Sequence, residues 1–339
     1  CNLCASYRMK GLCSIVLRNA KPYIIFAVMD MLSPKFEYNI LKFPTQMRLK
    51  EWWFTGFYDA KSGIYFSFFC ARLNVIDQFS LSIFDPKLPE PIHFSKRMYL
   101  RTEIYEGGFS MAYAAKTYSF SFRGETNGRL FLHLAHPRYT AKLNFEPSLP
   151  PFTKLEDNGK DWYGFVHQFG LQTNGQFSLD GVTHKVANAL AYSDHNFGKL
   201  PSNCRWHWLA VQHETISIAS LVNYGPNGQC YTQVLVNDPA YQQFADRWIR
   251  LSASVTFELN PLVAIDAGEW QLTSPDIELH VSPQQQYLEQ IALPPILPVF
   301  VKIAHREMHV KVHGRIRLEG NWIVVDGLHG VAEAHFGRW

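Results

Sequence analysis

From residue 36 onward the chain is a succession of short segments in which apolar and polar residues alternate, as in 63–73, 98–105, 118–123 and 129–136. Asn-Gly or Asp-Gly dipeptides occur at 127–128, 158–159, 174–175, 180–181, 227–228 and 326–327. Each dipeptide is typical of a type I′ hairpin turn when strands flank it. Strands joined in succession by hairpins favour antiparallel sandwiches or up-and-down barrels over alternating βαβ units. We therefore predict an all-β fold.

Helical patterns are scarce, so we expect only a few short helices. The best candidate is 239–249, PAYQQFADRWI, because proline stands at its start and apolar residues recur at helical spacing. The chain contains no G-x-G-x-x-G, Walker or G-x-S-x-G motif. Its sequence therefore does not favour a nucleotide-binding α/β fold or an α/β-type serine hydrolase.

The length of 339 residues is enough for two domains of ordinary size. We place the boundary in a predicted turn near residue 200, which gives an N-terminal domain of 36–200 and a C-terminal domain of 201–339. Residues 1–30 show neither strand alternation nor helix caps. We expect residues 1–35 to be an N-terminal extension that is either disordered or not native.

Charge and composition restrict the partners. A net charge of +3 without a basic run makes nucleic acid an improbable partner. No apolar run reaches the roughly 18 to 20 residues that a membrane span needs, which leaves peripheral membrane contact open. The six cysteines do not form a dense disulfide pattern. We expect reduced thiols and a cytoplasmic location, although an N-terminal cysteine also keeps a lipidated or exported N-terminus open.

The segment 190–213 contains an unusual polar run, Ser193-Asp194-His195-Asn196, between aromatic residues. Burying such groups costs free energy unless each finds a hydrogen-bond partner. The run is therefore either a functional site or a polar plug at a junction. We predict that it interrupts a strand at 187–192, and that the chain turns at Gly198 and Pro201 before an aromatic strand at 206–212.

Three motifs together resemble those of the carotenoid 1,2-hydratase, tocopherol-cyclase and AttH-like proteins. They are Glu51-Trp52-Trp53 with Gly56, Tyr192-x-Asp194-His195-Asn196-x-Gly198, and Trp206-x-Trp208 with Gln212. The resemblance covers the chain from about residue 36 and implies two tandem antiparallel lipocalin-like β-barrels or sandwiches. Phe197 stands where the hydratase-like motif usually has Trp. The C-terminal tail, 327–339, looks closer to a related bacterial family of unknown function.

The resemblance implies an apolar ligand, either isoprenoid, lipid or polyketide-like, in a barrel cavity. It also implies that Tyr192 and Asp194 carry acid chemistry. A desolvated Asp has a raised pKa and can donate a proton near neutral pH, and aromatic faces stabilise a carbocation. The further candidates for substrate binding are Trp52, Trp53, His195, Asn196, Trp206, Trp208 and Gln212. We expect no cofactor and no metal.

Two main interpretations follow. The protein is either a hydratase (lyase) or cyclase (isomerase), or a non-catalytic binding protein for a hydrophobic ligand, in which the polar run only closes a junction. A scaffold without a small ligand is a weaker third, which the aromatic content disfavours. Pairing of Asp194 with Arg or Lys would lower its pKa and argue against the acid role. On the strand 206–212 we expect the face with Trp206 and Trp208 to line a barrel interior.

Two histidine-rich segments remain. On the predicted strand 304–313 one face carries His305, Glu307, His309, Lys311 and His313. We interpret it as a solvated face, which is simpler than a metal-ligand pair of Glu307 and His309. A second group near the C-terminus could close on Asp326, and we give it the same low weight as a metal site. Its members are His329, Glu333 and His335.

Overall fold

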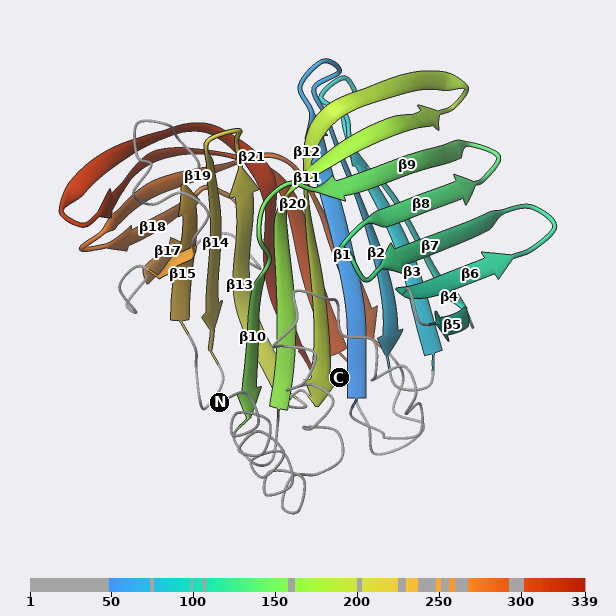
Figure 1. The fold of residues 1–339 in the computed structure, drawn as a ribbon, viewed down its shortest axis with the longest axis horizontal. Helices are drawn as coiled ribbons and strands as arrows, with labels where there is room; N and C mark the ends of the chain where they lie inside the picture. Colours follow the sequence, from blue (N-terminus) through green and yellow to red (C-terminus); the bar gives the residue numbers. More distant parts are fainter. Residues whose placement is uncertain are drawn as a thin grey trace, which may run out of the picture.

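The computed structural model describes residues 49–73, 76–98, 100–105, 108–157, 162–199, 203–224, 230–236, 248–250, 256–259, 268–292 and 302–338. These residues form two curled antiparallel sheets that lie side by side (Figure 1). The predicted all-β class, with two lipocalin-like barrels or sandwiches, is confirmed. The expected extension 1–35 lies outside the described residues, as do residues 239–247 of the predicted helix, whereas Trp248 and Ile249 belong to a strand.

The first sheet is built from the N-terminal part of the chain. Its strands run in the order β4-β3-β2-β1-β12-β11-β9-β8-β7-β6-β5, with β10 paired to β11. They are β1 (Leu49–Asp59), β2 (Ile64–Leu73), β3 (Ile76–Phe84), β4 (Ile92–Met98), β5 (Arg101–Tyr105), β6 (Gly108–Ala114), β7 (Ser119–Glu125), β8 (Leu130–Ala135), β9 (Tyr139–Pro147), β10 (Phe152–Asp157), β11 (Trp162–Leu179) and β12 (Val182–Lys199).

The second sheet follows directly, in the order β16-β15-β14-β13-β21-β20-β19-β18-β17. Its strands are β13 (Asn203–Gln212), β14 (Ile216–Asn223), β15 (Cys230–Val236), β16 (Trp248–Arg250), β17 (Thr256–Leu259), β18 (Trp270–Ser274), β19 (Ile277–Ala292), β20 (Lys302–Leu318) and β21 (Asn321–Arg338). The chain thus changes sheets between β12 and β13. Whether the two parts fold as separate domains divided at residue 200 stays a prediction.

The structure confirms some of the turns predicted at Asn-Gly and Asp-Gly dipeptides and contradicts others. Asp180-Gly181 joins β11 to β12 with both residues at positive φ, as a type I′ turn requires, and Asn127-Gly128 lies in the β7–β8 hairpin. The expected turns at 174–175 and 326–327 are wrong, because these dipeptides lie inside long strands where the pairing register shifts. Glycine at positive φ serves a bulge as readily as a turn. Residues 158–159 and 227–228 lie outside the described ranges.

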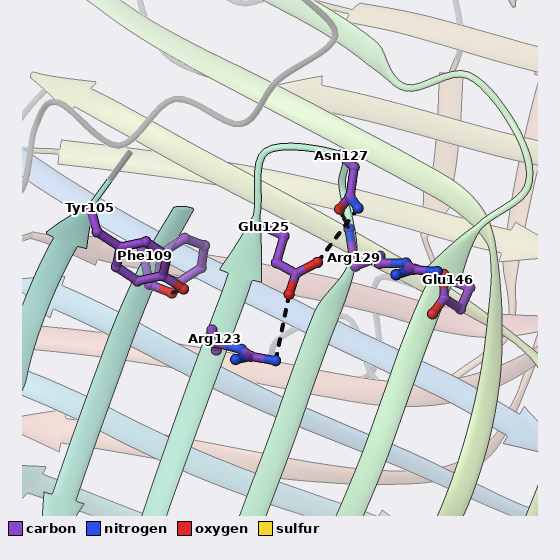
Figure 2. Close-up of polar contacts among 7 residues, drawn as sticks. All are labelled: Tyr105, Phe109, Arg123, Glu125, Asn127, Arg129 and Glu146. Atoms are coloured by element: carbon purple, nitrogen blue, oxygen red, sulfur yellow. Dashed lines mark hydrogen bonds and ion pairs between the residues drawn. The ribbon is translucent and has the colours of Figure 1, made fainter. Parts of the chain in front are cut away.

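The exposed β7–β8 end of the first sheet carries charged pairs (Figure 2). Arg129 pairs with Glu146 of β9, and Arg123 with Glu125. The side-chain oxygen of Asn127 accepts a hydrogen bond from the backbone N–H of Arg129 at 3.0 Å, which shapes the turn. Exposed ion pairs of this kind contribute little to stability, so the main stabilisation comes from the apolar cores.

Each sheet has its own apolar core, and a third cluster packs where the sheets meet. The first core is rich in phenylalanine and the second in valine, isoleucine and leucine. The third joins the faces of β1, β11 and β12 to those of β13 and β21, and its larger members are Phe54, Tyr65, Phe84, Phe165, Phe169, Tyr192 and Trp208. Figure 1 shows β1 and β12 beside β13, β20 and β21 at the centre of the molecule.

The predicted interruption of the strand at the polar run is wrong. Strand β12 continues through Ser193 to Lys199 without a break. Alternate side chains therefore leave on opposite faces. Ser193 and His195 turn into the first sheet's interior, whereas Asp194 faces the second sheet. Both faces of this strand are covered, so its polar groups can be buried with partners on either side.

The part of the chain that the structure describes contains no helix long and apolar enough to cross a membrane.

Candidate functional site between the two sheets

Asp194 lies at the centre of the face of β12 that meets the second sheet. Its Oδ2 accepts a hydrogen bond from the Tyr192 hydroxyl at 2.9 Å, and its Oδ1 accepts one from the Asn196 amide at 2.5 Å. The three residues occupy alternate positions of one strand and so share a face. Asp194 is only 4% exposed. The strand itself thus positions the carboxyl and both of its donors.

Burial raises the pKa of the Asp194 carboxyl to about 7, although hydrogen bonds from Tyr192, Asn196 and the Phe54 backbone act in the opposite direction. Across the described ranges no Lys or Arg forms an ion pair with this carboxyl, so no cation restores its usual acidity. Asp194 can therefore exchange a proton close to neutral pH.

His167 of β11 extends the hydrogen-bond chain. It stands opposite Asp194 in the β11–β12 register, and its Nδ1 lies 2.6 Å from the Tyr192 hydroxyl. Burial lowers the pKa of His167 to about 3, so the ring is neutral. Because Tyr192 gives its one hydrogen to Asp194, Nδ1 must carry the hydrogen that bonds the tyrosine oxygen. The His167 ring stacks on Trp208 at 4.7 Å, which ties β11 to the second sheet.

Two further carboxyls come from the second sheet. Glu307 of β20 accepts hydrogen bonds from Ser67 of the first sheet and from Tyr287, both at 2.7 Å. Glu333 of β21 pairs in register with Glu307 on one side and with Trp208 on the other. Burial raises the pKa of Glu307 and holds that of Glu333 well above its usual value. The charges of Asp194 and Glu307 raise the pKa of Glu333 further.

Tyr65 stands among these acids. Burial raises the pKa of its hydroxyl well above the usual value, and the charges of Glu307, Glu333 and Asp194 raise it further, in that order of size. Its ring lies over Gly56, where a Cβ would approach the hydroxyl oxygen to 2.3 Å. We call Asp194, Glu307 and Glu333 the carboxyl cluster. Its members come from both sheets, and the charges of all three raise the pKa of the Tyr65 hydroxyl.

Some of the predicted binding residues border this cluster. Trp52 is half-buried and pairs in register with Asn196, which puts it on the same face as Asp194. Trp206 is half-buried too and stacks on His335 at 3.8 Å. Trp208 is buried against His167. Gln212 accepts a hydrogen bond from the Gly170 backbone N–H at 3.0 Å and so links the sheets.

Trp53 and His195 lie elsewhere. Their side chains point into the first core, where the two rings stack at 4.2 Å, and His195 Nε2 is 2.8 Å from Glu51 Oε1. All three side chains are fully buried. Because side chains alternate along a strand, Trp53 on β1 and His195 on β12 leave on the face opposite to that of Asp194. Their role in substrate binding stays a prediction.

Two expectations about the second sheet are wrong. Trp208 does not line the interior of that sheet but packs between the sheets, because Leu209 and Val211 on the opposite face form the core. The histidine-rich face of β20 is not solvated along its length, since Glu307 and His309 are buried against the first sheet, although Lys311 is exposed.

His309, far from being solvated, stacks on Tyr65 at 4.9 Å. In the described ranges no three His, Cys, Asp or Glu side chains are grouped as ligands for one ion, in either histidine-rich segment or elsewhere.

Sequence reasoning did not select His167, Tyr65, Glu307 or Glu333 as site residues. Glu307 and Glu333 were considered only as weak metal ligands. One signal could have raised their weight: a Glu on each of two long strands, each flanked by histidines at alternate positions, in a strand-rich apolar region. Nothing in the sequence pairs these strands with β2 or β11, so the convergence is visible only in the tertiary structure.

Comparison with known proteins supports the fold. A proposed AttH from Nitrosomonas europaea aligns with a TM-score of 0.60 and 14% identity, over 86% of this chain and 93% of its own. Kievitone hydratase from Nectria haematococca aligns with a TM-score of 0.55 and 13% identity, over 85% of this chain and 89% of its own. At these identities the likeness shows the shared fold. It agrees with the AttH-like and hydratase-like group that the motifs indicated.

No curated protein sequence matches the chain. One family model does, over residues 32–339, and thus far beyond the C-terminal tail to which we limited the resemblance to a family of unknown function. The chain therefore belongs to the DUF2804 family, described as a domain of unknown function.

Proposed function

We propose that this protein binds an apolar small molecule, either isoprenoid, lipid or polyketide-like, where the two sheets meet, and that Asp194 catalyses acid-assisted hydration or cyclisation. One observation carries the proposal: a carboxyl with a pKa near 7, buried among aromatic rings, with Tyr192 and Asn196 as its hydrogen-bond donors. A carboxyl of this kind remains partly protonated at neutral pH and is a stronger acid than water toward a carbon–carbon double bond.

The chemistry balances without a cofactor. Protonated Asp194 gives its hydrogen to one alkene carbon, and the π electrons form that C–H bond and leave a carbocation at the other carbon. The faces of Trp208 and Tyr192 stabilise the cation by about 0.5 to 2 kcal/mol each. In hydration, water adds to the cation and its surplus proton returns to the Asp194 carboxylate. In cyclisation, a second double bond attacks the cation and closes the ring, which leaves a new cation. Loss of a proton from a carbon next to that cation forms a double bond, and the proton returns to the Asp194 carboxylate.

The fold neighbours support this reaction class without specifying it. One of them is named as a hydratase and shares the arrangement of two curled sheets. Hydration and cyclisation begin with the same protonation, so the geometry of Asp194 fits both. We also keep the expectation of a cytoplasmic location, which the buried free thiol of Cys70 suits.

The second candidate is a non-catalytic ligand-binding protein. It is favoured by the fact that both oxygens of Asp194 already bond to the chain's own donors, as in a polar plug at a junction. In that case the carboxyl cluster specifies how the sheets meet, and the ligand is only held.

The small molecules that co-purify with the wild type and with Asp194→Asn distinguish the enzyme from the non-catalytic binding protein. We expect mass spectrometry to find the same apolar ligand in both, and to find a mass increase of one water, or an isomer, only in the wild type. The exposed Asp326→Asn is the matched control and should behave as the wild type does. Equal ligand without any product in all three proteins would favour the binding protein, and absence of apolar ligand from all three would contradict both candidates.

A further inference from the structure

Three buried polar atoms beside the carboxyl cluster have no hydrogen-bond partner among the described residues. They are the Tyr65 hydroxyl, the Trp208 indole Nε1 and the His167 Nε2. The exposed fractions of these residues are only 2%, 5% and 3%. A buried donor or acceptor left without a partner destabilises the folded state, and such groups are therefore usually satisfied by protein, water or ligand. A water molecule or a polar group of a ligand could satisfy these three atoms.

The three atoms belong to one continuous set of contacts. His167 stacks on Trp208 at 4.7 Å and hydrogen-bonds Tyr192 at 2.6 Å. Tyr192 pairs in register with Gly56, and the Tyr65 hydroxyl lies over that glycine. The three atoms therefore come from three strands of two sheets, and each adjoins Tyr192 or its immediate neighbours.

The carboxyl cluster borders the same place on its other side. Glu333 is the register partner of Trp208, and Glu307 is bonded by Ser67, two residues from Tyr65 on the same strand. The charges of all three acids raise the pKa of the Tyr65 hydroxyl. The polar atoms without partners and the acids thus share one small region between the sheets.

The hydrogen-bonding capacities of the three atoms are complementary to an O–H group, which an alcohol ligand or a water molecule can supply. Indole Nε1 only donates, and a tyrosine hydroxyl donates or accepts. While Tyr192 donates to ionised Asp194, His167 carries its hydrogen on Nδ1, so its Nε2 only accepts. A hydroxyl group has one hydrogen to donate and two lone pairs that accept. It can therefore donate to His167 and accept from Trp208 and Tyr65 at once.

Other oxygen groups fit less well. A carbonyl oxygen accepts from Trp208 and Tyr65 but leaves the His167 acceptor unsatisfied. A carboxylate would add a negative charge beside three acids, which repels it. A hydrocarbon satisfies none of the three atoms.

We propose that these three residues form a subsite for a neutral hydroxyl group, and that the ligand held between the sheets is an apolar alcohol rather than a pure hydrocarbon. The inference rests on the proposed function, since it assumes that an apolar ligand binds where the sheets meet. Tyr65, Trp208 and His167 then determine which end of that ligand is buried beside Asp194.

Tryptophan-fluorescence titrations at pH 8 with three probes of equal chain length test the subsite: farnesol, farnesal and β-farnesene. In the wild type we expect farnesol to bind about tenfold more tightly than β-farnesene, with farnesal between them, as one or two added hydrogen bonds to buried groups would produce. Tyr65→Phe should weaken farnesol binding severalfold and leave β-farnesene unchanged. Since that hydroxyl has no partner within the described chain, we expect the variant to fold normally.

Tyr113→Phe, in the first sheet, is the matched control and should preserve the preference for farnesol. Equal affinity for farnesol and β-farnesene in the wild type would overturn the hydroxyl subsite while leaving the proposed function in place. An unchanged preference in Tyr65→Phe would also overturn it, because the hydroxyl would then be recognised elsewhere and water alone would satisfy Tyr65. If none of the probes binds, the proposed function fails together with the subsite.

Discussion

The hydroxyl of Tyr65 occupies the space that a side chain on Gly56 would take, because a Cβ built there lies 2.3 Å from the phenolic oxygen. Gly56 is the register partner of Tyr192, whose hydroxyl donates a hydrogen bond to Asp194. The missing side chain on β1 therefore allows a residue of β2 to reach the face of β12. The glycine of the Glu51-Trp52-Trp53 motif therefore has a physical role, because its lack of a side chain leaves space for the Tyr65 hydroxyl near the carboxyl cluster.

Gly56→Ala should displace Tyr65 and weaken farnesol binding to the level of Tyr65→Phe, with a loss of stability of about 1–3 kcal/mol from overpacking. Titration and urea unfolding measure the two effects. Gly124→Ala is the control, because its Cβ would meet Phe109 at 2.1 Å in the first core, away from the site. It should lose stability and keep ligand preference. An equal loss of farnesol binding in both variants would show that stability, and not the position of Tyr65, governs binding.

Asp194→Asn should stabilise the protein at pH 8. The folded-state pKa is raised from 3.8 to about 7, so above pH 7 the fold carries the cost of a buried negative charge, at most about 4 kcal/mol. As the pH falls through 7 toward 4 the wild-type carboxyl takes up a proton and this cost disappears. Urea unfolding should therefore show a gain for the variant at pH 8 that shrinks toward pH 4.5.

The exposed Asp180→Asn is the control for that series. It loses its ion pair with Arg138 and should gain no stability at pH 8. A variant Asp194→Asn that is less stable than the wild type at pH 8 would mean that Asp194 is stabilised as an anion in the fold, which contradicts its proposed role as an acid.

Glu307→Ala should destabilise the contact between the sheets by about 2–4 kcal/mol. It would leave the buried hydroxyls of Ser67 and Tyr287 without their acceptor. Glu307→Gln retains one acceptor oxygen and should therefore lose clearly less stability than Glu307→Ala. Urea unfolding of the two variants provides the comparison. Equal losses would indicate that the volume of the side chain, and not its hydrogen bonds, stabilises this contact.

His309→Phe should reduce the sensitivity of the fold to acid. Burial, and to a smaller extent the charge of His329, lower the pKa of His309 to about 3. The unfolded chain takes up a proton near pH 6.5 and the folded chain does not, so this histidine removes stability as the pH falls below 6.5. As the pH falls from 7.5 to 5, the free energy of unfolding of the variant should rise by about 2 kcal/mol relative to that of the wild type. Phenylalanine preserves the stacking on Tyr65.

Denaturant unfolding at the two pH values measures that difference. His133→Asn, at an exposed position of β8, should reproduce the wild-type profile. A constant difference between His309→Phe and the wild type across this range would contradict a neutral, buried His309.

Parts of the site were predictable because they lie close together in the chain. The family resemblance named Tyr192 and Asp194 for acid chemistry and Asn196 for substrate binding. Their common face was not predicted, because we expected the polar run to interrupt the strand, whereas alternation along the continuous β12 puts all three on one side. Asp180-Gly181 was likewise predictable as a turn, since the conformation of two residues is a local property. The same local signal at 174–175 was misleading, because the length of a strand depends on its neighbours.

The sequence by itself determined the all-β class and hairpins such as the one at Asp180-Gly181, since these depend on residues near one another in the chain. Only the tertiary structure decided what covers each face. Around Asp194, Trp208 and Glu307, both faces of β12, β13 and β20 are buried, one in a sheet's own core and the other between the sheets, and period-2 alternation cannot distinguish the two. Tyr65, His167, Glu307 and Glu333 come from four strands whose pairing depends on the global register, and that register places Glu307 opposite Glu333 and His167 opposite Asp194.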